Sequence, residues 1–120
     1  MSARIAAKRV YAAPERGDGY RVLIDRLWPR GISRERAKLD EWARELAPST
    51  ELRRWFGHDP DRFGEFRTRY RRELRAHADQ LGRLRERARA GPLTLLYGAR
   101  DTEHNDAVVL AEVLREARRA

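Results

Sequence analysis

The chain has 120 residues and a mass of 14.1 kDa, the usual size of one domain, so we expect a single domain over residues 1–120. Its 27 Lys and Arg against 19 Asp and Glu give a formal net charge of +8. The absence of cysteine excludes disulfides, thiolate metal ligands and a cysteine nucleophile. Because no run of about 18 apolar residues and no signal-peptide core is present, we expect a basic cytoplasmic protein without a membrane partner.

Three segments, residues 4–11, 20–28 and 93–99, have the composition of β-strands. The apolar run Val22-Leu23-Ile24 in the second segment indicates burial on both faces of a sheet. The turn between the first two segments is too short for a helical crossover. Those two strands are therefore either antiparallel partners or not neighbours, and the strand order stays open.

Four further segments carry helix signals. Ser33 is a good N-cap for an amphipathic helix to about residue 47, and Ser49 or Thr50 for a short helix that ends at Gly57. Asp59-Pro60 begins a long helix, which has an apolar stripe from Phe63 to Leu84 and a break near residues 78–82. A last helix follows Arg100-Asp101-Thr102 and runs to about Arg118. Strands separated by helices indicate one compact α/β domain, with a small, mainly parallel sheet of three or more strands flanked by about four helices.

Charged residues stand where two of these strands end. Asp25 and Arg26 follow the apolar run of the second strand, and Trp28 and Arg30 lie just beyond them. Open α/β sheets bind ligands at the carboxyl ends of their strands. Asp25 and Arg26 alternate faces of the strand, so they are not expected to serve the same neighbour. They either form a structural ion pair that ties the strand to a helix, or Arg26 faces a ligand with Trp28 and Arg30 close by.

The third strand leads into a helix start that also carries charge. Asp101 or Thr102 can cap this helix, and free backbone N–H groups in its first turn favour an anion. We therefore predict that Arg26, Arg30, Arg100 and His104 form a pocket for a phosphate- or carboxylate-bearing small molecule, because guanidinium groups bind both anions bidentately. The residues expected around it are Tyr11, Asp25, Trp28, Asp101 and Asn105.

No familiar cofactor motif is present, and the three histidines lack metal-ligand spacing, so no metal or cofactor is expected. Residues 67–89 contain nine Arg and only three acidic residues. This charge is typical of a solvated helix face. It also suits an alternative function, a nucleic-acid-binding or regulatory module that uses the face Arg67–Arg89. A third reading is an interaction protein or homodimer without a ligand.

Five stretches of the chain resemble a known bacterial family in order: KRVY (8–11), GYRVLIDRLWPRG (19–31), LAPSTELRRWFGHDP (46–60), FRTRYRREL (66–74) and TLLYGARDTEHN (94–105). They resemble the YeaO-like group of the uncharacterised domain-of-unknown-function family 488 (DUF488). The resemblance implies an α/β domain and brings no established activity with it.

A more distant branch of that family is similar at the two strand ends. At the end of its second strand that branch has an Asp-x-Arg…Pro pattern. Asp25 and Pro29 fit this pattern, and Arg26 lies one position from the place of its arginine. Where that branch has a Cys-His pair, this chain has His104-Asn105. The resemblance thus implies that any cysteine nucleophile is lost. His104 is the residue left for general acid/base catalysis, a role that suits histidine side chains in general, and whether the protein is an enzyme stays open.

Overall fold

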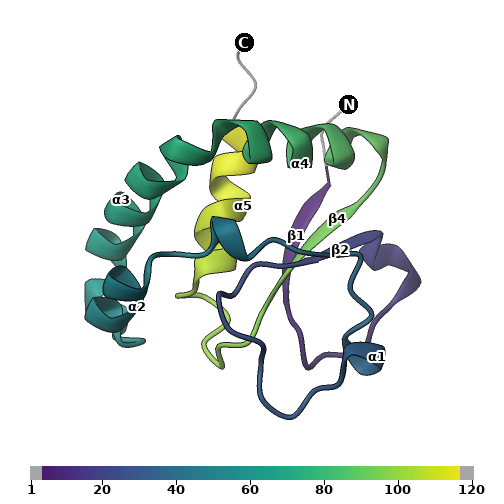
Figure 1. The fold of residues 1–120 in the computed structure, drawn as a ribbon, viewed down its shortest axis with the longest axis horizontal. Coiled ribbons are helices and arrows are strands. Elements are labelled where there is room, and N and C mark those ends of the chain that lie inside the picture. The colour runs from purple at the N-terminus through teal and green to yellow at the C-terminus, as the bar shows by residue number, and fades with distance from the viewer. Residues whose placement is uncertain (1–3, 117–120) are drawn as a thin grey trace.

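A computed structural model describes residues 4–116 and contains a four-stranded sheet in which all strands are parallel (Figure 1). The strand order is β1-β4-β2-β3, with bounds Ile5–Arg9 (β1), Tyr20–Leu23 (β2), Glu41–Trp42 (β3) and Leu93–Tyr97 (β4). This arrangement confirms an α/β fold with a parallel sheet. The first two strands are not neighbours, because the fully buried β4 lies between them.

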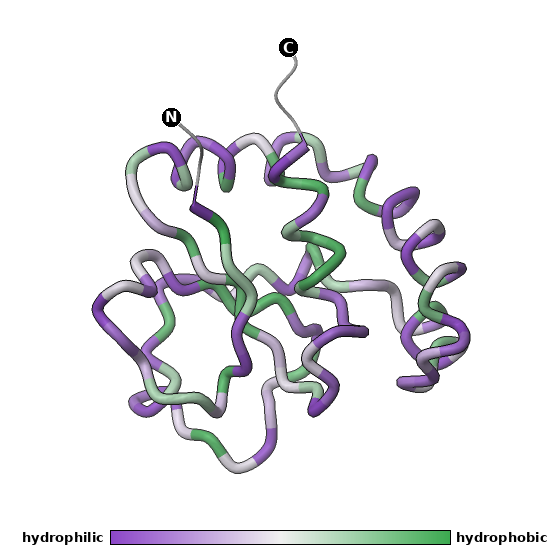
Figure 2. The backbone as a smooth tube through the Cα atoms, turned by 180° about the vertical axis from the view of Figure 1, so that it is seen from behind, coloured by the Kyte–Doolittle hydropathy of each residue, from purple (hydrophilic) through white to green (hydrophobic). Residues whose placement is uncertain are grey.

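Five α-helices surround the sheet: Arg34–Ala37 (α1), Thr50–Phe56 (α2), Phe63–Leu74 (α3), Ala78–Ala90 (α4) and Asp106–Glu116 (α5). In Figure 1, α3 and α4 form an arc around α5, which contacts β1 and β4. Seen from behind in Figure 2, α5 is more hydrophobic than α3 or α4, as expected of a helix covered on both sides. Across residues 4–116, every helix falls short of the length and apolar content that a membrane crossing requires.

The helix predicted for residues 33–47 is wrong beyond its first turn. Ser33 does act as N-cap by accepting a hydrogen bond from Arg36 N, but α1 ends at Lys38, whose φ of 46° is left-handed. The chain then pairs with β2, where Asp40 accepts from Arg21 N at 2.8 Å and its own N–H donates to Arg21 O. Trp42 therefore lies in a strand paired with β2, and Leu39 and Trp42 both pack against the core on this face of the sheet, although their spacing is typical of a helix.

Other boundaries follow the local signals more closely. Ser49 caps α2 through Leu52 N, and Gly57 ends that helix with a φ of 55°. The long helix breaks at a 3-10 turn over Arg75–His77, just before the predicted place. The last helix begins only at Asp106, and its predicted end near residue 118 lies outside the described residues.

The core has two parts, one on each face of the sheet. The larger part fills the space between the sheet and helices α2 to α5 and includes the fully buried Tyr70, whose hydroxyl donates to Leu46 O at 2.5 Å. The smaller part packs Val10, Leu23 and Leu96 against the α1 segment. The sheet therefore separates the two parts of the core.

Candidate functional site

A pocket of about 410 Å³ lies at the carboxyl ends of the parallel strands. Its walls come from the segments that follow β1, β2 and β4, from the start of α5, and from α2 and the loop after it. This is the edge where open α/β sheets bind ligands. The lining residues are Tyr11, Asp25, Arg26, Leu27, Trp28, Pro29, Arg30, Pro48, Arg53, Phe56, His58, Phe66, Gly98, Ala99, Asn105 and Asp106.

The floor of the pocket is built where β2 and β4 end. The last sheet hydrogen bond runs from Ile24 N to Leu96 O at 3.2 Å, and Asp25 then turns its carboxylate to the end of β4. There Asp25 Oδ2 accepts from Gly98 N at 2.8 Å. A Cβ on Gly98 would lie 3.0 Å from that oxygen, so a glycine at this position allows the close approach.

A second carboxyl group, that of Asp106 in the first turn of α5, joins Asp25. The two carboxyl groups lie close enough to shift each other's pKa, and a hydrogen bond between them requires a proton on one of them. Burial raises the pKa of both groups, and the Asp25 charge raises that of Asp106 further, well above its usual range. Both effects favour the protonated form of Asp106, and the pair carries one negative charge when that proton is bound.

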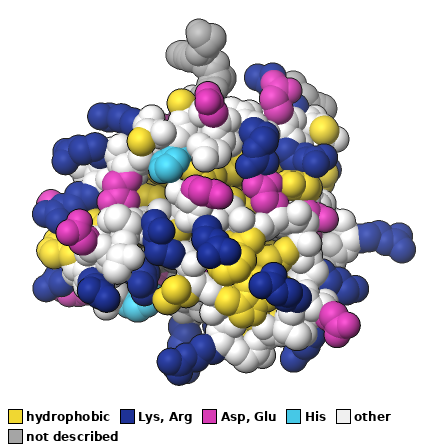
Figure 3. Space-filling model, viewed as in Figure 1, with side chains coloured by type: hydrophobic (Ala, Val, Ile, Leu, Met, Phe, Trp, Pro, Cys, Tyr) yellow, Lys and Arg dark blue, Asp and Glu magenta, His cyan; other side chains and the backbone are white. Residues whose placement is uncertain are grey.

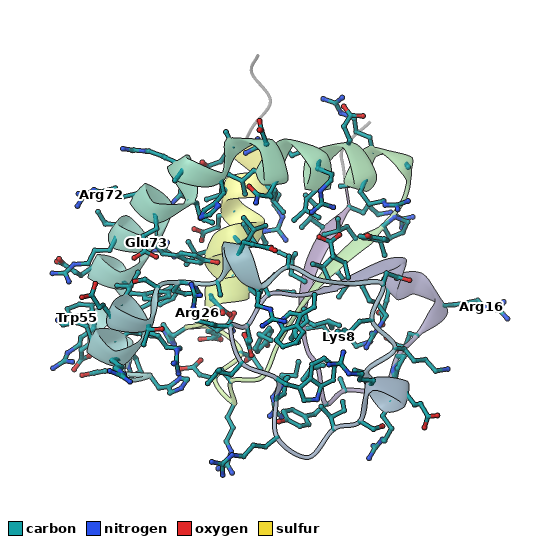
Figure 4. The ribbon with its side chains drawn as sticks, viewed as in Figure 1. Lys8, Arg16, Arg26, Trp55, Arg72 and Glu73 are labelled. Carbon is teal, nitrogen blue, oxygen red and sulfur yellow. The ribbon has the colours of Figure 1, made fainter. Side chains whose placement is uncertain are left out.

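Cationic side chains face this acid pair across the pocket. Arg26 is half-buried and donates to Pro48 O at 3.3 Å and Ala47 O at 3.5 Å, which holds it between α2 and the strands (Figure 4). Arg30 and Arg53 are exposed at the pocket rim. Among residues 4–116, none of these three arginines has a carboxylate oxygen within 4.0 Å, so their charges are free for a ligand.

His58 reaches the pocket from the loop after α2. Its φ of 59° is left-handed, which is uncommon outside glycine, and it follows Gly57 in the same conformation. Two successive left-handed residues reverse the chain at the end of α2. This reversal places the imidazole at the pocket, which Arg53 also lines, and the positive charge of Arg53 lowers the pKa of Asp25 against the effect of burial.

Aromatic side chains make the remaining walls. Trp28 donates its indole N–H to Ile32 O at 2.8 Å and packs edge-on against Trp42. Phe56 and Phe66 stack with ring centroids 4.3 Å apart. These contacts fix the wall, so the pocket combines an apolar body with charged ends.

Six of the predicted site residues line this pocket: Tyr11, Asp25, Arg26, Trp28, Arg30 and Asn105. The Asn105 amide is used within the protein, because it caps α5 through Val108 N and donates to Asp101 O. Tyr11 donates its hydroxyl to Arg30 O at 2.6 Å and so braces the segment after β2. These two residues shape the pocket wall through contacts inside the protein.

The other three predicted residues, Arg100, Asp101 and His104, lie outside the pocket lining. Asp101 caps the turn before α5 by accepting from the backbone N–H groups of Glu103 and His104. His104 Nδ1 lies 2.9 Å from Asp101 Oδ2, and its ring packs edge-on against Phe63. The His104 ring therefore lies against α3 and not in the pocket.

Three lining residues with ionisable side chains were not predicted: Arg53, His58 and Asp106. Asp106 adjoins the predicted Asn105, so its position in the same segment was the available signal. Arg53 lies three positions before the core residue Phe56, which puts both on one side of α2. Nothing local in the sequence indicates that α2 covers the strand ends. Within the described residues, no group of three His, Cys, Asp or Glu is placed to hold a metal ion.

The arginines of α3 and α4 bear on the alternative function. Arg67 and Arg71 pair with Glu112 of α5, and Arg83 pairs with Glu41 of β3. Figure 3 shows acidic side chains interspersed among the basic ones, while Figure 4 shows Arg72 pointing outward. The face Arg67–Arg89 is therefore less basic than its residue count suggests.

Comparison with known proteins gives a consistent result. A family model described as "Inactive DUF488-N3 subclade" matches residues 4–120. The chain is 50% identical to the uncharacterized protein YeaO of Escherichia coli over 111 residues, which cover 92% of this chain and 96% of that protein. It is 40% identical to the uncharacterized proteins Mb3100c of Mycobacterium bovis and Rv3073c of Mycobacterium tuberculosis, covering 92% of this chain and 93% of each relative. No solved structure matches the chain.

Proposed function

The chain belongs to the DUF488 family, whose relatives carry no described activity, and from its pocket we propose that it binds a small molecule with an anionic group. The anionic group is a carboxylate or a phosphate, and the pocket is the one at the carboxyl ends of the strands. Binding at this edge follows the general rule for open parallel sheets.

The observation that carries the proposal is the set of three arginines around one pocket. Arg26 and Arg30 come from the segment after β2 and Arg53 from α2, and within residues 4–116 no carboxylate pairs with any of them. Three guanidinium charges outnumber the single negative charge of the acid pair. A guanidinium fork matches two oxygens of a carboxylate or phosphate, so an anion at this rim gains directed hydrogen bonds.

Two facts support binding in preference to catalysis by His104. The His104 imidazole hydrogen-bonds Asp101 and contacts Phe63, outside the pocket that holds the arginines. The description of the matching family model contains the word "inactive". Both agree with a protein that holds a ligand without turning it over through that histidine.

The proposal is tested by an amide NMR titration with inorganic phosphate, using sodium chloride at equal ionic strength as the control. We expect phosphate to shift amide signals of the pocket segments 25–30, 53–58 and 98–106, and chloride to leave them in place. Shifts spread evenly over α3 and α4, or equal shifts with both salts, would overturn a specific anion site in the pocket.

A further inference from the structure

The two ends of the pocket differ in charge. Asp25 and Asp106 lie together where β2, β4 and α5 meet, while Arg30 and Arg53 lie at the rim. The charged or titratable groups that face the pair from the packed elements are Arg53 and His58 of the α2 segment, Arg26, Tyr70 of α3 and Tyr97 of β4. The pair thus faces basic side chains and two tyrosines, of which Tyr70 already donates its hydroxyl to Leu46 O.

An anionic group alone suits only one of these ends. A phosphate or carboxylate against the acid pair would meet a like charge in a partly buried place, which is costly. The ligand atoms that reach the pair must instead donate hydrogen bonds. Asp25 Oδ2 already accepts from Gly98 N, which fixes the carboxylate in the floor and leaves its other oxygen for such a donor.

Building on the proposed anion-binding function, we propose that the ligand of this pocket is a small zwitterion of the amino-acid type. Its ammonium or amidinium nitrogen binds Asp25 and Asp106, and its anionic group binds Arg30 and Arg53. Its apolar body lies along Trp28 and Phe56, which line the pocket beside these charged groups. A pocket of about 410 Å³ has room for such a molecule.

The proposal carries a defined proton balance. In the free protein, one proton joins the two carboxyl groups. When a cationic nitrogen of the ligand replaces this proton, the O–H bond of the protonated carboxyl group breaks and the proton passes to the solvent. Both carboxylates then accept hydrogen bonds from N–H groups of the ligand. Binding of the zwitterion therefore releases a proton, whereas binding of a simple anion at the rim does not.

Three matched probes test the inference by calorimetry: phenylalanine, 3-phenylpropionate, which lacks the amine, and phenethylamine, which lacks the carboxylate. We expect phenylalanine to bind roughly tenfold or more tightly than either of the others, because each lacks one charged partner. Titrations in two buffers of different ionisation enthalpy should show proton release with phenylalanine and none with 3-phenylpropionate.

The Asp106→Asn variant separates the two ends of the pocket. It should lose the preference for phenylalanine and the proton release while binding 3-phenylpropionate at least as well as the parent. Asp25→Asn is the second variant, and Glu103→Gln is the matched control, since Glu103 is exposed and does not line the pocket. Thermal unfolding of each variant shows whether it is folded.

The outcomes distinguish the two proposals. Equal affinity for phenylalanine and 3-phenylpropionate, or phenylalanine binding without proton release, would overturn the zwitterion and leave the anion site standing. Failure of every probe, together with failure of inorganic phosphate in the NMR titration, would overturn both.

Discussion

The Asp25 carboxylate accepts a hydrogen bond from Gly98 N at 2.8 Å and thereby joins the ends of two neighbouring parallel strands. Asp25 belongs to the segment after β2, and Gly98 is the first residue after β4. The carboxyl group of Asp106, at the start of α5, lies close enough to the same carboxylate that each shifts the pKa of the other. One side chain thus sets the positions of three chain segments around the pocket.

Replacing Gly98 with alanine should weaken this junction. The new Cβ would lie 3.0 Å from Asp25 Oδ2 and 3.6 Å from Pro29 Cβ, so a neighbour must shift, at a cost of about 1–2 kcal/mol. Urea unfolding measures the loss. Gly82→Ala is the control, because its Cβ meets nothing within 4 Å inside α4, and it should instead stabilise by about 0.5–1 kcal/mol. Equal effects of the two substitutions would contradict the account of Gly98.

The acid pair should make the free energy of unfolding fall as the pH rises, and the Asp106→Asn substitution should remove this dependence. Burial raises the pKa of Asp106 well above its usual range, so the folded state binds more protons than the unfolded state. This contribution is complete below the unfolded Asp pKa near 4 and is lost as pH rises through the raised pKa of the folded state. Relative to the parent, the variant should therefore gain stability as the pH rises above about 4, until the pH passes the raised pKa of Asp106 in the folded state. Urea unfolding at several pH values measures the difference, and a constant difference would refute the shared proton.

Arg53 and Arg54 are neighbours on α2, and both are exposed, but only Arg53 lines the pocket. Arg53→Gln should lower the affinity for inorganic phosphate roughly tenfold, the size of one charged hydrogen bond. Arg54→Gln changes the net charge equally and should leave the affinity unchanged. NMR titration of both variants measures the effect. If the two lose affinity equally, general electrostatic attraction would explain binding better than a site.

Arg21 should be a main stabilising residue on the other face of the sheet. It is buried, pairs with Asp18, and donates to Ala37 O at 2.6 Å and Lys38 O at 3.0 Å. Arg21→Leu would leave the Asp18 carboxylate buried without this partner, and we expect a loss of about 3 kcal/mol in urea unfolding.

The control for Arg21 is the exposed Arg16, which points away from the body of the protein in Figure 4. Arg16→Leu should change the free energy of unfolding by less than about 0.5 kcal/mol. A similar small effect at both positions would show that the remaining partner of Asp18, Lys8, suffices to hold the buried carboxylate.

The features that the sequence predicts well are those determined by neighbouring residues. The N-caps Ser49 and Asp59 and the helix end at Gly57 depend on side-chain and backbone contacts a few positions apart. The buried strand β4 is a short apolar run between clear breaks. The location of a pocket at the strand ends follows from the α/β pattern itself.

The features that it misses depend on contacts between distant segments. The helix after Ser33 is cut short because Asp40 pairs with the backbone of β2. Arg53 reaches the pocket because Glu73 of α3 accepts hydrogen bonds from the N–H and hydroxyl of Ser49 and so ties α2 in place (Figure 4). The acid pair exists only when β2 and α5 are packed together, so neither Asp25 nor Asp106 reveals it alone.

The order of the strands has a consequence for synthesis of the protein. Within the described residues, β1 hydrogen-bonds to β4 and to no other strand, and β4 is the last strand to leave the ribosome. Until residues 93–97 emerge, the apolar faces of β1 and β2 have no central strand to join them, and their unpaired edges are exposed to other chains. A nascent chain that stalls before Leu93 should therefore depend on chaperones, although three quarters of the chain has already been made.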